Sequence, residues 1–314
     1  MAEGFITRRG GVAGEPVEPT PTTFMNATGG TTLEYNESGK RYKSHTFTSS
    51  GNFVVTALSD VENANKVDYL IIGGGGGGSA GARCSGGGGA GGYRTTLGTS
   101  GGNSPAEPKL LLEQTTYSVI IGAGGMNFSD PPPAFSGNHT FLFNKKTAIG
   151  GAGGSDRRRQ GFNRVNDGGS GGGTGDAGGL TGPGTNGMLE QGTNGGGGTF
   201  INSTTGTGGG GGGAGQAGAN GTTSSGGKGG DGLANTLRTG SVETRAGGGG
   251  GSARGRSAGA GGAGGGGAGS SGANTSGTSG SANTGSGGGG GVQEGNGGNG
   301  GSGIVIIRYE IAPN

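Results

Sequence analysis

The residues that could bind a metal or act as a nucleophile are few in this sequence and widely spaced. Cys84 is the only cysteine, so no disulfide can form within the chain. His45 and His139 are the two histidines, and neither has a flanking ligand pattern. A zinc or copper site needs several clustered nitrogen, sulfur or oxygen ligands. We therefore expect no metal and no cofactor.

A glycine motif of the dinucleotide-binding type follows an apolar run. Gly73, Gly75 and Gly78 match G-x-G-x-x-G directly after residues 69–72. The motif binds a pyrophosphate when a helix opens at its third glycine and an acidic residue follows about 20 positions on. Here more glycine follows, and Arg94 stands near the acidic position. Because no Ser/His/Asp set, nucleophile elbow, P-loop or acidic pair can be assembled either, we expect no enzyme.

Composition excludes most ordinary folds. Glycine accounts for 94 of the 314 residues, tryptophan is absent and the hydrophobic residues make up 26%, which is too little for one large conventional core. The 21 basic and 19 acidic residues nearly cancel, so a pI of 8.7 gives no strong case for nucleic acid as a partner. The start of the chain has no apolar stretch typical of a secretory signal, and no run of about 20 apolar residues occurs. We expect synthesis in a cytoplasm and no membrane insertion.

Short runs of β-branched and aromatic residues, bounded by Gly, Asn, Ser or Asp, predict strands between residues 31 and 149. The turn TSSG, between residues 47 and 52, has the length of a hairpin connection, so the strands on either side of it are predicted to be antiparallel neighbours. The predicted strands are 32–35, 41–47, 52–57, 66–72, 109–112, 116–121 and 141–143.

Three runs, at 69–72, 119–121 and 304–307, are apolar at every position. Such runs are typical of strands that are covered on both faces, and one small sandwich would cover all three. The last run must then return to the same core some 150 residues after the others. We therefore predict a mainly β fold: a small antiparallel β-sandwich formed by residues 31–149 and the closing strand at 304–314, with residues 150–303 inserted between them.

The inserted segment is too poor in apolar side chains to fold by burial. Residues 168–303 hold nine large apolar residues, which cannot offset a chain entropy of roughly 1–2 kcal/mol per residue. Collagen is excluded because the glycine spacing is irregular and only 10 prolines occur. Two alternatives remain, a flexible Gly/Ser linker and a bundle of polyglycine II helices.

Polyglycine II is an extended left-handed helix with three residues per turn and no internal hydrogen bonds. Its N–H and C=O groups point outward, so neighbouring helices must satisfy them, and a Cβ would keep the backbones apart. Ordering glycine costs the most entropy of any residue. We therefore expect about ten segments bonded on several sides, with Ala214, Ala263, Ser270 and Asn299 on outer faces.

The order of several motifs resembles a glycine-rich domain of phage tail-fibre and other appendage proteins, notably of marine phages. The resemblance covers about residues 45–310, and the terminal motif is its most specific part. The glycine segment is also similar to the fibre-tip adhesins of T-even-type phages, in which stacked polyglycine II helices present host-binding loops at one end. The motifs are HTFTSSGNFVV (45–55), VDYLIIGGGGGGSAG (67–81), GGGGAGGYRT (86–95), YSVIIGAGG (117–125) and GGSGIVIIRYE (300–310).

The resemblance implies a non-enzymatic virion protein whose contact residues are variable loops, so no receptor residue can be transferred by position. Aromatic residues suited to stacking on sugars and arginines suited to phosphate or carboxylate interrupt the glycine tracts. For each, a solvated connecting loop or a subunit seam is the alternative. The candidate contact residues are Phe128, Phe135, His139, Arg157, Arg158, Arg159, Arg164 and Arg238.

Residues 1–30 lie outside the resemblance, and the first 23 of them end in a Pro/Glu/Thr-rich connector. We interpret them as a virion-anchoring leader, with Phe5, Ile6, Arg8 and Arg9 as candidate anchor residues. The expected function is a fibre or adhesin of the virion that contacts other virion proteins and a host-surface glycan or protein, as a homo-oligomer. A capsid decoration or head fibre without a receptor role, and a cellular extracellular or ice-binding protein, are the alternatives.

Overall fold

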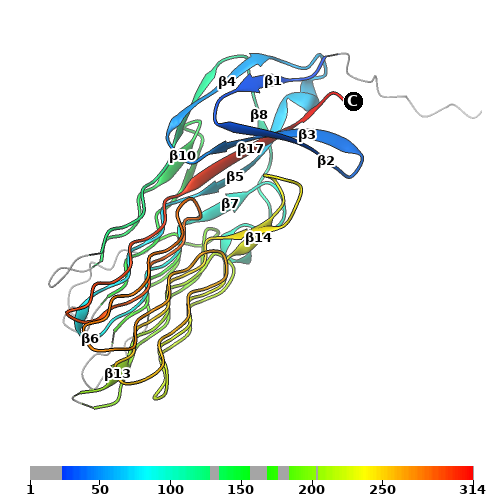
Figure 1. Ribbon diagram of the computed structural model, residues 1–314. Helices are drawn as coiled ribbons and strands as arrows, with labels where there is room; N and C mark the ends of the chain where they lie inside the picture. Colours follow the sequence, from blue (N-terminus) through cyan, green and yellow to red (C-terminus); the bar gives the residue numbers. More distant parts are fainter. Residues whose placement is uncertain (1–22, 128–133, 156–167, 176–183, 203, 314) are drawn as a thin grey trace, which may run out of the picture.

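A computed structural model describes residues 23–127, 134–155, 168–175, 184–202 and 204–313. Two antiparallel sheets lie at one end of the molecule, and the glycine tracts extend from them as a bundle of side-by-side segments (Figure 1). The predicted mainly β fold is confirmed. Both the first described residues and the labelled C-terminus lie at the sandwich end (Figure 1).

Each sheet of the sandwich is antiparallel. The six-stranded sheet has the order β2 (Thr31–Glu37), β3 (Lys40–Phe47), β17 (Ile304–Ile311), β5 (Lys66–Ile72) and β7 (Tyr93–Thr95), and β8 (Leu110–Leu111) also pairs with β5. The five-stranded sheet has the order β1 (Asn26–Thr28), β4 (Gly51–Ala57), β9 (Thr116–Ile120), β10 (Thr140–Leu142) and β11 (Lys146–Ala148).

Short elements complete the described chain. Three two-stranded pairs lie outside the main sheets: β6 (Gly81–Cys84) with β16 (Val292–Gln293), β12 (Thr199–Phe200) with β13 (Gly206–Thr207), and β14 (Leu233–Asn235) with β15 (Glu243–Arg245). The 3-10 turns η1 (Glu62–Asn65) and η2 (Gly101–Asn103) are short connections.

The main core lies between the two sheets. Phe53 of β4 and Leu142 of β10 pack there with Tyr69 of β5 and Ile307 of β17, all fully buried. The closing strand occupies the middle of the six-stranded sheet, because β17 pairs with β3 on one side and with β5 on the other. The expected return of the last strand to the same core is therefore confirmed.

β5 and β17 are covered on both faces, as their sequences predict. Leu70 and Ile306 point away from the main core into a second cluster, where Leu237 of the β14–β15 connection covers them. The remaining apolar run, at 119–121, departs from the prediction. Ile120 of β9 is 43% exposed, so only one face of that strand is covered. The difference arises because β9 belongs to the five-stranded sheet, on whose outer face the described residues leave Ile120 without an equivalent cover.

The turn TSSG does not close a hairpin, contrary to the prediction. β3 pairs with β2 and β17, whereas β4 pairs with β1 and β9, so the turn carries the chain from one sheet to the other. The hairpin in this region is β2–β3, whose two-residue turn is Ser38 and Gly39. Both residues have positive φ, 52° and 78°, as a turn matched to the twist of a hairpin requires.

The glycine tracts are joined by backbone hydrogen bonds with a period of three residues. In the tract 73–79, Gly73, Gly76 and Ser79 donate to the tract 86–92. Gly75 and Gly78 donate to residues 301 and 298, and the two remaining amides donate to residues 138 and 135. Carbonyls of the same tract accept from the segments at 151–154, 288–291 and residue 125. This tract is therefore bonded on every side, and its described residues form neither α-helix nor regular strand.

Backbones approach so closely in the bundle that many of its interior positions have no room for a Cβ. A Cβ on Gly76 would overlap the carbonyl oxygen of Ala152, and one on Gly88 would overlap that of Gly76. Of the small residues expected on outer faces, Ala263 and Asn299 are exposed. Ala214 and Ser270 are buried, because Ala214 packs beneath the sheet and the Ser270 hydroxyl donates to the Thr275 carbonyl at 2.8 Å.

Candidate functional site

The end of the glycine bundle farthest from the sandwich is formed by β6, the β12–β13 pair and the loop at 253–257 (Figure 1). Direct contacts join these elements. The Cys84 thiol donates to the carbonyl oxygen of Gly206 at 2.9 Å, and the Arg254 amide donates to the Cys84 sulfur at 3.2 Å. We call this region the distal end.

Three arginines and one aromatic ring gather at the distal end, and we call Arg83, Phe200, Arg254 and Arg256 the distal arginine cluster. The Arg83 guanidinium lies 5.6 Å from the centroid of the Phe200 ring, a cation–π distance, and donates to the Asn202 carbonyl at 3.4 Å. This contact between Arg83 and Phe200 therefore joins β6 to the β12–β13 pair.

Neutral oxygens hold the other two guanidinium groups. Arg256 donates to the Thr223 and Gly255 carbonyls, each at 3.1 Å. Arg254 donates to the side-chain oxygen of Gln293 at 2.9 and 3.1 Å, in the amide orientation that satisfies both groups. Guanidinium groups fixed in this way keep their charge and further N–H donors for phosphate or carboxylate.

The sequence analysis missed this cluster because its arginines are far apart along the chain. Arg254 and Arg256 stand between two glycine tracts, in SARGRSAG, and Arg83 stands between two others. One signal could have located these arginines: each is a charged residue at a junction between two glycine tracts. The bundle then places these junctions together at its end.

Two predicted contact residues belong to the segment that leads into β10. Phe135 is 49% exposed, and its backbone bonds to Met126 and to Gly77 within the bundle, each at 3.0 Å. His139 is exposed, and its Nδ1 accepts a hydrogen bond from the Gly150 amide at 3.0 Å. Phe135 thus lies at the surface, while His139 also completes the backbone bonding of a glycine tract.

Arg238 lies on another part of the molecule, in the connection between β14 and β15. Its carbonyl accepts from the Ser44 hydroxyl of β3 at 2.7 Å, and its guanidinium pairs with Glu243. The hydrogen bond from Arg238 holds the pKa of Glu243 below its ordinary value. The structure therefore ties Arg238 to the sandwich and does not place it with the distal arginine cluster.

The other predicted residues fall outside the described part of the chain. They are the contact candidates Phe128, Arg157, Arg158, Arg159 and Arg164, and the anchor candidates Phe5, Ile6, Arg8 and Arg9.

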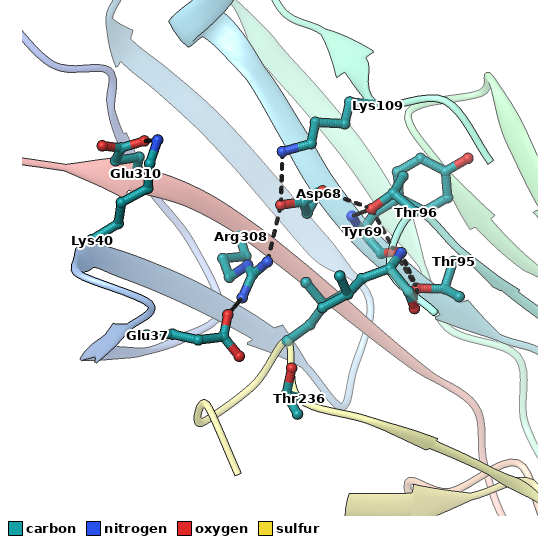
Figure 2. Close-up of polar contacts among 12 residues, drawn as sticks. Glu37, Lys40, Asp68, Tyr69, Thr95, Thr96, Lys109, Thr236, Arg308 and Glu310 are labelled. Carbon is teal, nitrogen blue, oxygen red and sulfur yellow. Dashed lines mark hydrogen bonds and ion pairs between the residues drawn. The ribbon is translucent and has the colours of Figure 1, made fainter. Parts of the chain in front are cut away.

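A buried polar network crosses the six-stranded sheet (Figure 2). The Arg308 guanidinium, on β17, donates to Asp68 of β5 at 3.2 Å and also pairs with Glu37 of β2. Lys109 donates to the same Asp68 carboxylate at 3.1 Å. The Arg308 guanidinium also lies 4.3 Å from the Tyr42 ring centroid. The two cations of the network balance its two anions. We therefore assign the network a structural role, which is to hold strands β2, β5 and β17 together.

The described residues contain no group of three or more His, Cys, Asp or Glu side chains placed to hold a metal ion. Within the same ranges, no helix has the length and apolar character needed to cross a membrane.

Comparison with known families decides the classification. A family model described as a glycine-rich domain matches residues 47–310. The chain belongs to this glycine-rich domain family. The glycine-rich domain begins at the last residue of β3 and ends within β17, so it takes in the whole bundle and leaves out β1 and β2. No curated protein matches the chain.

Proposed function

We propose that this protein is a non-enzymatic structural protein of a phage virion, a fibre or adhesin that presents loops for recognition of the host surface. It would be made in the host cytoplasm and assembled into the particle as a homo-oligomer. Residues 1–30 would attach it to other virion proteins, and its host partner would be a surface glycan or protein. Neither a cofactor nor nucleic acid enters this proposal.

We further propose that the glycine tracts are polyglycine II helices. The supporting observation is the period of three in the hydrogen bonds: Gly73, Gly76 and Ser79 share one neighbouring tract, while the residues between them turn to others. A helix with three residues per turn directs its amides in this way. Backbone bonding on all sides would also offset the entropy of ordering glycine.

One observation carries the adhesin proposal: the first described residues and the labelled C-terminus lie at the sandwich end of the molecule, opposite the distal end (Figure 1). Thr23 is the first described residue, and the labelled C-terminus lies at the same end, in the sandwich. A leader attached there would point the bundle outward from the particle. The loops of the distal end would then be the first part of the protein to reach a cell.

Localisation on intact particles tests this proposal. Antibodies raised against the full chain, with gold labels, would be applied to particles of the phage that encodes it. We expect label at fibre tips; label on the capsid would favour a decoration protein, and no label would refute a virion role. Deleting residues 1–22 should remove the protein from particles while the purified variant keeps its cooperative thermal transition.

A further inference from the structure

We infer that the distal arginine cluster is a binding site for anionic saccharides, that is, for sugar chains that carry carboxylate or phosphate groups. The inference rests on the proposed function in one respect: it takes the distal end to face the host. The site is formed by Arg83, Phe200, Arg254 and Arg256 at the distal end, and nothing in the sequence analysis assigned these residues a role.

The contrast with the other arginines of the described chain supports this inference. At the sandwich end, Arg41 pairs with Glu34 and Arg94 pairs with Glu107. Arg238, Arg245 and Arg308 likewise pair with carboxylates. Arg254 and Arg256 instead use carbonyl and amide oxygens, and no carboxylate within the described ranges pairs with either. Within the part of the chain that the structure describes, their positive charge has no acidic partner, so it remains for a ligand.

The hydrogen bonds of the three arginines also limit the conformational entropy that is lost when a ligand binds. Each guanidinium already has fixed partners, which are Asn202 for Arg83, Gln293 for Arg254 and Thr223 for Arg256. Side chains held in place before binding lose less conformational entropy when a ligand arrives. Glu294 is exposed beside Gln293, but within the described residues this one acid is outnumbered by Arg254 and Arg256.

A saccharide, rather than an anion of any kind, is favoured by the aromatic ring. Phe200 is half-buried and lies against Arg83, so it offers an apolar surface next to the Arg83 guanidinium. Sugar rings present C–H faces that stack on aromatic side chains, and the acidic substituent can be bound by a guanidinium fork. The hydrogen bond from the Cys84 thiol to the Gly206 carbonyl holds the backbone of β6 and β13 together beside the site.

The test measures binding of the full-length protein to immobilised polysaccharides by biolayer interferometry. Polygalacturonate carries carboxylates, phosphomannan carries phosphates, dextran is neutral and polyglutamate is an anionic polymer without sugars. We expect binding to polygalacturonate, phosphomannan or both, and much weaker binding to dextran and polyglutamate. Stronger binding to polygalacturonate would identify carboxylate as the preferred acidic group, and stronger binding to phosphomannan would identify phosphate.

Variants assign the binding to the cluster. Arg254→Gln with Arg256→Gln should weaken binding at least about tenfold, since each lost charged hydrogen bond costs roughly that factor. The matched control is Arg41→Gln, an arginine paired with Glu34 at the sandwich end, which should leave binding unchanged. Thermal transitions show whether each variant is folded, and Arg256→Lys provides a milder second change that should weaken binding less.

The inference is overturned if neither anionic polysaccharide binds, if polyglutamate binds equally well, or if the double variant binds like the unsubstituted protein. These results leave the virion proposal standing, because particle labelling tests that proposal separately. Conversely, absence of the protein from particles with intact saccharide binding would refute the virion role alone.

Discussion

Gly76 donates its amide hydrogen to the carbonyl oxygen of Gly89 at 2.8 Å, although neither residue belongs to a strand. The Gly76 carbonyl in turn accepts from Gly288 at 3.0 Å. Main-chain contacts of this kind replace side-chain packing throughout the bundle. They also explain how a segment with so few large apolar residues can have a defined structure.

Gly88→Ala should destabilise the protein by about 3 kcal/mol. The new methyl group would overlap the Gly76 carbonyl, and the backbone cannot yield without breaking the bond to Gly288. Gly51→Ala is the matched control, because a Cβ there would lie 3.8 Å from the Phe47 ring, an ordinary contact. Urea unfolding of both variants measures the change. Equal stability of the two would show that close backbone approach is unimportant.

Arg308→Met should cost about 3–5 kcal/mol, the usual penalty for removing one partner from a buried ion pair. The side chains of Arg308 and Asp68 are each 4% exposed, so water cannot replace the lost contact. Lys40→Met removes the exposed Lys40–Glu310 pair of the same region (Figure 2) and should cost under about 1 kcal/mol. Chemical denaturation compares the two variants, and similar small losses would contradict a structural role for the network.

The stability of the sandwich should fall as the pH is lowered through about 6.5, the ordinary pKa of histidine. His45 is fully buried: its Nδ1 donates to the Gly29 carbonyl at 2.6 Å, and its Nε2 faces the Tyr309 hydroxyl at 3.2 Å. Burial lowers the pKa of His45 in the folded protein. Below pH 6.5 the unfolded chain binds a proton that the folded chain does not, so stability is full above this pH and decreases below it.

The expected slope is at most about 1.4 kcal/mol per pH unit, as one proton allows. Unfolding free energies between pH 7.5 and 5.5 measure it. His139→Gln should keep the slope, because His139 is exposed, whereas His45→Gln should remove it. A stability that is constant over this range in the unsubstituted protein would count against the buried neutral imidazole.

Much of the sandwich was predictable from sequence because its strands are short runs bounded by turn residues. All the predicted strands correspond to observed ones, and the run at 304–307 carried the signal that the last strand returns to the core. Pairing was harder to predict. The turn at Ser38 and Gly39 closes a hairpin, whereas TSSG crosses between sheets, and the difference depends on which residues the core buries.

The distal arginine cluster could not be predicted from sequence. Its location depends on how glycine tracts lie beside one another, and glycine has no side chain to specify register. The contacts that bring Arg254 next to β6 and β13 are between backbone and sulfur atoms far apart in the chain. The positions of Phe135 and Arg238 depend in the same way on their neighbours in space.

Hydrogen–deuterium exchange, resolved to individual tracts, tests the central claim most directly. If neighbouring main chains hold the bundle together, the amides of residues 73–79 and 86–92 should exchange at least about a thousandfold more slowly than those of an unstructured peptide. They should also be about as well protected as those of β5 and β17. Exchange of these tracts at the rate of a free peptide, while the sandwich strands remain protected, would contradict the account.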